Sequence, residues 1–88
     1  MPTVLVESGF VVRIYGPPRE HPPAHVHVEH GADELVVIRL RQKNSPQRVW
    51  RVYGMRDRDV VSAFRIVKAN HARIMKAWRR LHGKHEGQ

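Results

Sequence analysis

The sequence predicts an α+β fold: a small antiparallel β-meander of three to four strands, followed by one kinked helix or two helices at the C-terminus. Three observations support this. Residues 1–54 hold short alternating or β-branched segments separated by turn-forming residues. The rest of the chain shows an apolar repeat of three and four residues, typical of a helix. The strand segments precede the helical part instead of alternating with it, which favours α+β over α/β.

Four segments are predicted as strands. Residues 10–15, FVVRIY, are β-branched and aromatic, which favours a strand. Residues 25–29, HVHVE, alternate strictly between polar and apolar side chains. Residues 34–41, ELVVIRLR, form the clearest strand, and residues 48–54, RVWRVYG, form a short fourth one.

The sequence also predicts the connections between these segments. Residues 17–23 contain four prolines, which lack the N–H that a sheet needs, so we expect a stiff, ordered loop there. Residues 30–33, HGAD, predict a hairpin turn. In residues 25–29, between the loop and the turn, the alternation predicts that Val26 and Val28 face the core.

The helical part carries one apolar stripe. A helix over residues 57–82 would be about 39 Å long, which is long for so small a domain. We therefore expect a break and N-cap at Asn70, giving helices over about residues 57–69 and 71–82, with Gly83 as the C-terminal stop. One continuous, kinked helix is the alternative that the periodicity favours. The stripe consists of Val60, Phe64, Val67, His71, Ile74, Trp78 and Leu81.

Length and composition exclude several classes of protein. With 88 residues the chain forms a single domain, 1–88, too short for a dinucleotide-binding fold. The absence of cysteine excludes disulfides, cysteine-ligated zinc and a cysteine nucleophile. No apolar run approaches the roughly 20 residues of a membrane span, and the start lacks a secretory signal, so a cytoplasmic protein with no membrane partner is expected. A homo-oligomer is compatible with the sequence.

Positive charge is distributed unevenly over three parts of the domain. The net charge is +8, and residues 55–85, the basic helical segment, carry +7 of it. Residues 1–54 are β-rich and hold the histidine motif, and residues 86–88 are a short tail. The basic segment predicts an anionic partner: RNA, DNA or an acidic protein. Candidate binding residues are Arg39, Arg41, Arg56, Arg58, Arg65, Lys68, Arg73, Lys76, Arg79 and Arg80.

Aromatic residues could add base stacking to this electrostatic attraction. Tyr15, Trp50 and Tyr53 lie in the β-rich part, and each could stack on a nucleic-acid base if its ring is exposed. Trp78 lies on the helical stripe and is expected in the core.

The segment EHPPAHVHVEH, residues 20–30, is the most distinctive motif. His25 and His27 are two residues apart on a predicted strand, so their imidazoles lie on the same face. Such a pair can bind a divalent transition metal, with His21 as a third ligand. A carboxylate, Glu29 or Glu34, is the alternative third ligand.

Two other interpretations of the histidines remain open. His25 and His27 could act as general acid and base on a phosphodiester, because histidine titrates near neutral pH. They could equally be polar residues that face solvent from a strand.

The motifs of the chain resemble the bacterial domain-of-unknown-function family 4160 over nearly the whole length. This chain differs from the family pattern in carrying Ala24 between the prolines and the first histidine of the H-x-H pair. The resemblance implies no established activity and no agreed catalytic residues. It does imply a second small protein encoded nearby, in a toxin–antitoxin-like pair. The matching residues are Met1–Leu5, Gly9–Phe10, Tyr15, Glu20–His21, Pro22–Pro23, His25–Val28 and Trp78.

Two functions are therefore expected. The first is a component of a toxin–antitoxin-like pair that binds nucleic acid or an acidic partner protein through the basic helical segment. The alternative is a small ribonuclease that depends on His25 and His27, either as acid and base or as ligands of a divalent metal.

Overall fold

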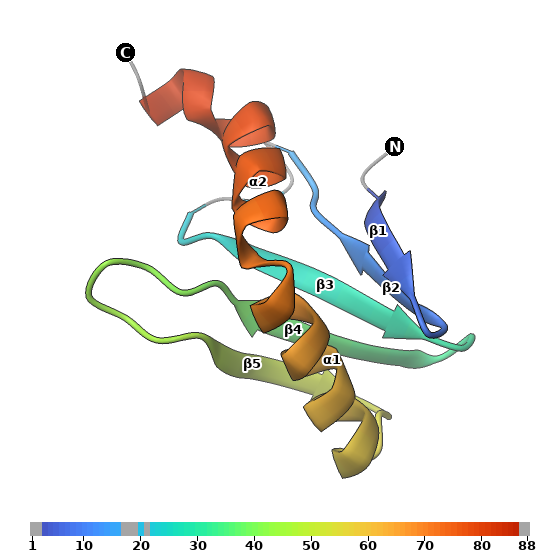
Figure 1. The fold of residues 1–88 in the computed structure, drawn as a ribbon. Helices are drawn as coiled ribbons and strands as arrows, with labels where there is room; N and C mark the ends of the chain where they lie inside the picture. The colour runs from blue at the N-terminus through green and yellow to red at the C-terminus, as the bar shows by residue number, and fades with distance from the viewer. Residues whose placement is uncertain (1–2, 17–19, 21, 87–88) are drawn as a thin grey trace.

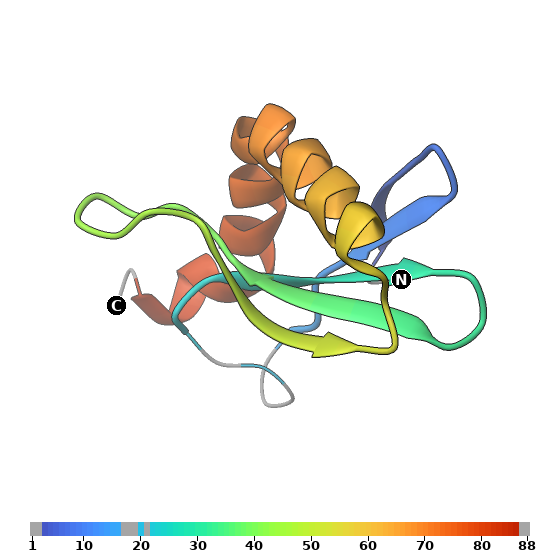
Figure 2. The same cartoon turned by 90° about the horizontal axis from the view of Figure 1, so that it is seen from below.

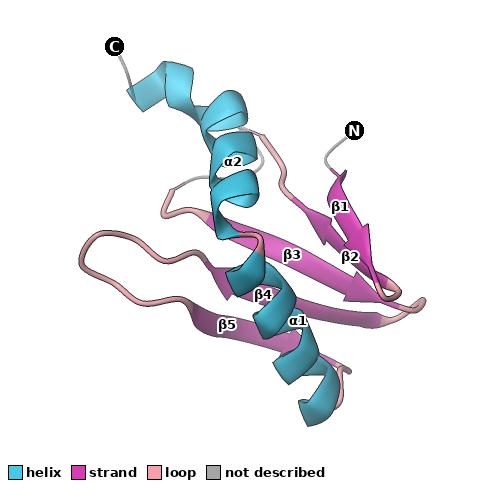
Figure 3. Cartoon of the chain, viewed as in Figure 1, coloured by secondary structure: helices cyan, strands magenta, loops and turns pink. Residues whose placement is uncertain are grey.

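The structure, a computed structural model, describes residues 3–16, 20 and 22–86. Within these residues, five antiparallel strands form one sheet in chain order, and two helices follow (Figures 1 and 3). The predicted α+β meander with two C-terminal helices is confirmed, but with five strands instead of three to four. The elements are β1 (Thr3–Glu7), β2 (Phe10–Arg13), β3 (His25–His30), β4 (Glu34–Arg39), β5 (Arg48–Tyr53), α1 (Asp57–Ala69) and α2 (His71–Glu86).

The additional strand is β1, which pairs with β2 through a two-residue turn. Ser8 and Gly9 form the turn with φ angles of 52° and 83°. Positive φ at both central residues is the type I′ arrangement, whose twist matches that of the two strands it joins. The sequence gives only a weak signal for β1, because TVLVE has three consecutive apolar residues instead of an alternation, and serine is an unusual residue at the first turn position.

The core lies between the sheet and the helices. α1 crosses one face of the sheet, and the described part of the loop between β2 and β3 lies on the other side (Figure 2). Val26 and Val28 are fully buried, as the alternation predicted. Burying side chains of this size stabilises the fold by about 1.5–3 kcal/mol each. Other fully buried side chains are Val12, Ile14, Val36, Ile38, Leu40, Val67 and Ile74.

The predicted break at Asn70 is confirmed, although its side chain acts differently than expected. The side-chain amide of Asn70 donates to the Ile66 carbonyl at 2.8 Å and so caps the end of α1, not the start of α2. The backbone carbonyl of Asn70 accepts the first bond of α2 from Ile74, at 2.9 Å.

The buried face of α2 differs from the predicted stripe only after Trp78. Leu81, predicted in the core, is 42% exposed, and His82 is buried in its place at 3%. Ile74 and Trp78 remain buried, so the buried residues of α2 follow a spacing of four after the break. The predicted stop at Gly83 is wrong, because α2 continues to Glu86. In the described part of the chain, neither helix is long and apolar enough to cross a membrane.

Candidate functional site

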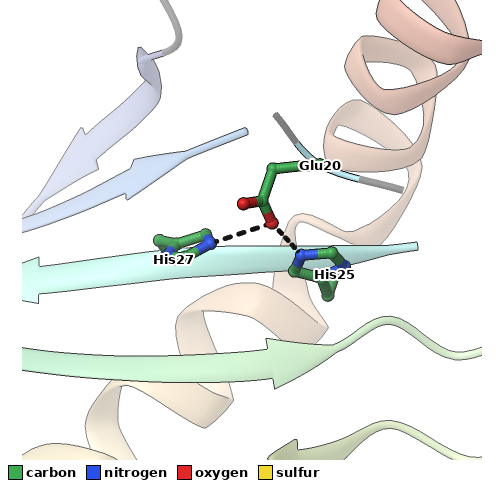
Figure 4. A group of neighbouring side chains, drawn as sticks. All are labelled: Glu20, His25 and His27. Atoms are coloured by element: carbon green, nitrogen blue, oxygen red, sulfur yellow. Dashed lines mark hydrogen bonds and ion pairs between the residues drawn. The ribbon is translucent and has the colours of Figure 1, made fainter. Parts of the chain in front are cut away.

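Glu20, His25 and His27 meet on the face of the sheet opposite α1, and we call this group the His–Glu centre (Figure 4). The two histidines are on β3, and their side chains share one face. Both present Nε2 to the same carboxylate oxygen, Oε1 of Glu20. His27 Nε2 lies 3.3 Å from that oxygen, and His25 Nε2 is closer.

His25 is fixed on both sides of its ring. Its Nδ1 lies 2.8 Å from the carbonyl oxygen of Pro23. A carbonyl can only accept, so Nδ1 carries a proton and donates it. Nε2 is therefore the ring atom that faces Glu20. The ring is 8% exposed and lies 5.3 Å from the ring of Trp50 and 5.6 Å from that of Trp78.

Glu20 reaches the centre from the proline-rich loop. Burial raises the pKa of its carboxyl, but hydrogen bonds with His25 and His27, and the charges of these rings, outweigh burial and lower the pKa. The group is therefore a carboxylate at neutral pH.

The third member of the centre differs from every predicted one. His21 lies outside the described residues. Glu29 instead forms an ion pair with Arg13 at 3.2 Å, and Glu34 contacts His30 at 2.7 Å. The residue that sequence reasoning missed is Glu20. Its only signal was its place beside His21 in the motif, because a ligand from a loop follows no periodicity.

A hollow of about 370 Å³ opens beside the His–Glu centre. Trp50 and Tyr53 are 41% and 49% exposed there, so the condition for base stacking is met at both. Tyr15 is half-buried and meets His27 edge-on, with ring centroids 5.2 Å apart. Besides the centre, the lining consists of Leu35, Val37, Trp50, Arg51 and Tyr53.

The predicted basic residues do not form one patch. Those of α1 and α2 are all exposed. Among the residues that the structure describes, no lysine or arginine of either helix forms an ion pair with a carboxylate. The exposed set comprises Arg56, Arg58, Arg65, Lys68, Arg73, Lys76, Arg79 and Arg80.

Three of these cations line one groove. Arg73, Lys76 and Arg80 follow one side of α2 and border a groove of about 430 Å³ against β1, which we call the α2 groove. Arg73 also donates to the carbonyl of Val4 at 3.3 Å. The spacing of three and four residues places all three on one face of the helix.

The remaining basic residues lie elsewhere. Arg41 borders a second depression with Lys68 and His71. Arg79 borders a third, beside the prolines of the loop. Arg39 is half-buried and donates to the Ser45 hydroxyl at 3.2 Å, so it is not part of the exposed helical surface.

His71 is half-buried on α2, as predicted from its place on the stripe. Burial and the nearby charges of Arg41 and Arg79 lower its pKa. Its Nδ1 is buried without a hydrogen-bond partner among the described residues. These features favour the neutral ring.

A second group of histidine and carboxylates lies at the other end of β3. His30 Nδ1 lies 2.7 Å from Glu34 Oε1 and 3.9 Å from Asp59 Oδ2. The ring of His30 stacks on Phe10, with centroids 4.3 Å apart. This group offers one imidazole, whereas the His–Glu centre offers two.

The chemistry open to the His–Glu centre follows from its donors. Two imidazole nitrogens and one carboxylate oxygen suit a transition metal such as zinc. Without a metal, the same imidazoles can exchange protons with a bound phosphodiester.

Comparison with known proteins identifies the family. The family model described as a domain of unknown function, DUF4160, matches residues 9–79, most of the chain. No curated protein and no solved structure matches the chain. The matched span includes β2 to β5, the His–Glu centre, α1 and the part of α2 that carries Trp78. The chain therefore belongs to the DUF4160 family of domains of unknown function.

Proposed function

We propose that the chain binds single-stranded RNA in the hollow beside the His–Glu centre. The observation that carries the proposal is the pair of exposed rings, Trp50 and Tyr53, next to Arg51 in one hollow of the sheet. Exposed aromatic rings on a sheet stack on unpaired bases, and each stacked base contributes about 1–3 kcal/mol. The guanidinium of Arg51 would neutralise a phosphate of the same strand.

The exposed helical cations support the affinity of such a complex. They have no carboxylate partner among the described residues, and three of them line the α2 groove. Lysine and arginine beside phosphates release condensed counterions, so binding becomes weaker as salt increases. This part of the affinity would not depend on sequence.

In this proposal the chain is one component of a toxin–antitoxin-like pair, which the family resemblance supports. The second component would be an acidic protein encoded nearby. Charge complementarity would direct it to the exposed helical surface and speed its association. DNA is the other nucleic acid that the same cations would attract.

Tryptophan fluorescence tests the RNA proposal directly, because Trp50 is exposed and Trp78 is buried. A short oligouridylate should quench the wild-type chain, and the effect should decrease with salt. Trp50→Phe should abolish the quenching. In anisotropy, Tyr53→Ala should weaken binding by about tenfold. Val6→Ala is the matched control, because Val6 is 63% exposed on β1 and lines neither the hollow nor the α2 groove.

Two outcomes would contradict the proposal. One is equal affinity in Tyr53→Ala and Val6→Ala. The other is failure to bind RNA at any salt concentration while an acidic partner protein binds. Single-stranded DNA and duplex RNA serve as comparison ligands, and both should bind less tightly than the oligouridylate.

Cleavage of RNA at the His–Glu centre is a second candidate function. It is favoured by the two Nε2 atoms that face one carboxylate beside a hollow lined by Arg51. A phosphate held by Arg51 would lie close to His27, which could transfer a proton. RNA cleavage by wild type and its loss in the double variant His25→Ala/His27→Ala would support this function. A double variant that cleaves RNA as fast as wild type would refute it.

A further inference from the structure

We propose that the His–Glu centre is a mononuclear site for a divalent transition-metal ion, with Glu20, His25 and His27 as its three protein ligands. This inference depends on the geometry of the centre and not on RNA binding. Its third ligand is the loop carboxylate of Glu20, whereas the sequence predicted His21, Glu29 or Glu34, of which His21 lies outside the described residues.

The separation of one donor pair fits a metal ion, whereas His25 Nε2 is in direct hydrogen-bond contact with Glu20 Oε1 and would have to separate from it to admit an ion. Around a tetrahedral zinc with bonds of about 2.0–2.1 Å, neighbouring ligand atoms are about 3.3 Å apart. His27 Nε2 and Glu20 Oε1 are 3.3 Å apart. All three donor atoms lie within 4.8 Å of one another.

The hydrogen bonding of His25 leaves a lone pair directed into the centre. Its Nδ1 donates a proton to the Pro23 carbonyl at 2.8 Å, so Nε2 is the ring atom available to a metal ion when the ring is neutral. An ionised carboxylate is also an acceptor, so the contact between Nε2 and Glu20 requires a shared cation, which is either a proton or a metal ion. A ligating histidine typically donates its other N–H to a backbone carbonyl in this way.

An imidazolium–carboxylate ion pair is the competing interpretation. It explains both contacts if His25 is the imidazolium and a neutral His27 donates from Nε2, because one carboxylate oxygen accepts two hydrogen bonds. In a metal site both rings are instead neutral and both Nε2 atoms face the ion, so binding of a metal ion distinguishes the two interpretations.

The surroundings resemble an open metal site more than a closed structural one. His25 is buried against Trp50 and Trp78, and these rings close one side of the centre. The hollow of about 370 Å³ opens on another side. Three protein ligands with a remaining open position are typical of catalytic zinc. With Arg51 in the lining, an anionic oxygen such as that of a phosphate suits the open position.

Metal titration of the full-length, untagged chain tests the inference. After treatment with a chelator, isothermal titration with Zn²⁺ should give one ion per chain. Co²⁺ should give the visible absorption of nitrogen and oxygen ligation. Glu20→Gln and His27→Gln should each weaken Zn²⁺ binding by at least about tenfold. Both side chains are partly exposed, and circular dichroism checks that each variant is folded.

The second histidine–carboxylate group provides the matched control. His30→Gln removes a histidine from the same strand and from a group of similar composition, and it should leave Zn²⁺ binding unchanged. Wild type without stoichiometric Zn²⁺ would overturn the proposal and leave the ion pair. Equal losses in His30→Gln and His27→Gln would overturn it as well. Quenching of Trp50 by RNA in the absence of metal is measured separately, so failure of one proposal is distinguishable from failure of the other.

Discussion

At the scale of single residues, one loop carbonyl determines the orientation of the His25 ring. Pro23 accepts the Nδ1 proton at 2.8 Å and so directs Nε2 toward Glu20. His27 has the same residue type on the same face, but its ring meets Tyr15 edge-on and is more exposed. The two identical side chains thus have different surroundings. Residue type and spacing cannot distinguish them.

The lowered pKa of His71 predicts how the free energy of unfolding depends on pH. Its pKa is lowered by burial and by Arg41 and Arg79, and Lys68 borders the same depression. Below about pH 6.5, the ordinary histidine pKa, the unfolded chain therefore binds this proton more readily than the folded chain. The free energy of unfolding should consequently decrease on acidification. His71→Gln should reduce that decrease.

Urea denaturation at about pH 7.5, 6.5 and 5.5 measures this effect. The difference between wild type and His71→Gln isolates the one ring, because the other histidines titrate in both chains. The stability of wild type relative to the variant should decline toward low pH. A difference that stays constant with pH would show that His71 is not the responsible group.

At the scale of elements, the turn between β1 and β2 and the break between the helices depend on local backbone chemistry. The turn has positive φ at Ser8 and Gly9. The break depends on Asn70, whose amide binds the last turn of α1 and also lies 3.4 Å from Glu7 Oε1. A polar contact therefore links the helix junction to β1. This contact joins residues that are far apart in the sequence.

Gly9→Ala should destabilise the hairpin. Gly9 has φ of 83°, and a Cβ there would meet the His30 ring at 3.9 Å, an ordinary contact. The loss therefore arises from the left-handed backbone and is expected to be about 1–2 kcal/mol. Chemical denaturation measures it.

Gly16→Ala is the control for this prediction. Gly16 does not have a left-handed backbone, and a Cβ there would meet Leu81 at 3.8 Å. We expect no loss of stability, or a gain of up to about 1 kcal/mol from the reduced entropy of the unfolded chain. Equal losses at both glycines would contradict this account of the turn.

At the scale of the whole molecule, the two faces of the sheet have different surroundings. α1 lies over one face of the sheet (Figure 2), while the His–Glu centre and the hollow belong to the opposite face. Trp78 connects the two parts, because it is buried in the core and its ring lies 5.6 Å from that of His25. His82 stacks on Trp78 at 3.7 Å and contacts the Tyr15 carbonyl at 3.0 Å.

Two substitutions in α2 test which face of this helix supports the fold. Trp78→Ala removes a side chain that is 3% exposed and should lower the free energy of unfolding by about 3–5 kcal/mol. Leu81→Ala removes one that is 42% exposed and should change it by less than about 1 kcal/mol. Thermal and chemical denaturation compare them. Similar losses in the two variants would mean that Leu81 also faces the core, as the periodicity alone predicts.

Much of the fold was predictable because it depends on local patterns. Alternation identified β3 and the core positions of Val26 and Val28, and the helical repeat identified both helices. Leu81 was misplaced because positions three and four residues after Trp78 both continue a helical stripe, and the sequence does not record that His82 instead of Leu81 faces the core. β1 was missed because its turn begins with serine at positive φ.

The candidate site was predictable only in part, for a related reason. The H-x-H spacing placed His25 and His27 on one face, since strand geometry has a period of two. Glu20 came from a loop, and a loop has no period from which its side-chain position can be inferred. The exposed state of Trp50 and Tyr53 depends on which face the helices leave open.

By itself, the sequence determined the fold class, the break between the helices, the pairing of the two histidines on one face and the concentration of positive charge in the helical part. Only the tertiary structure decided the third member of the centre, the orientation of His25, the neighbours of each cation and the buried face of α2. The physical reason is the range of the forces involved. Periodicity and charge are properties of neighbouring residues, whereas a site forms where packing brings distant segments within hydrogen-bond distance.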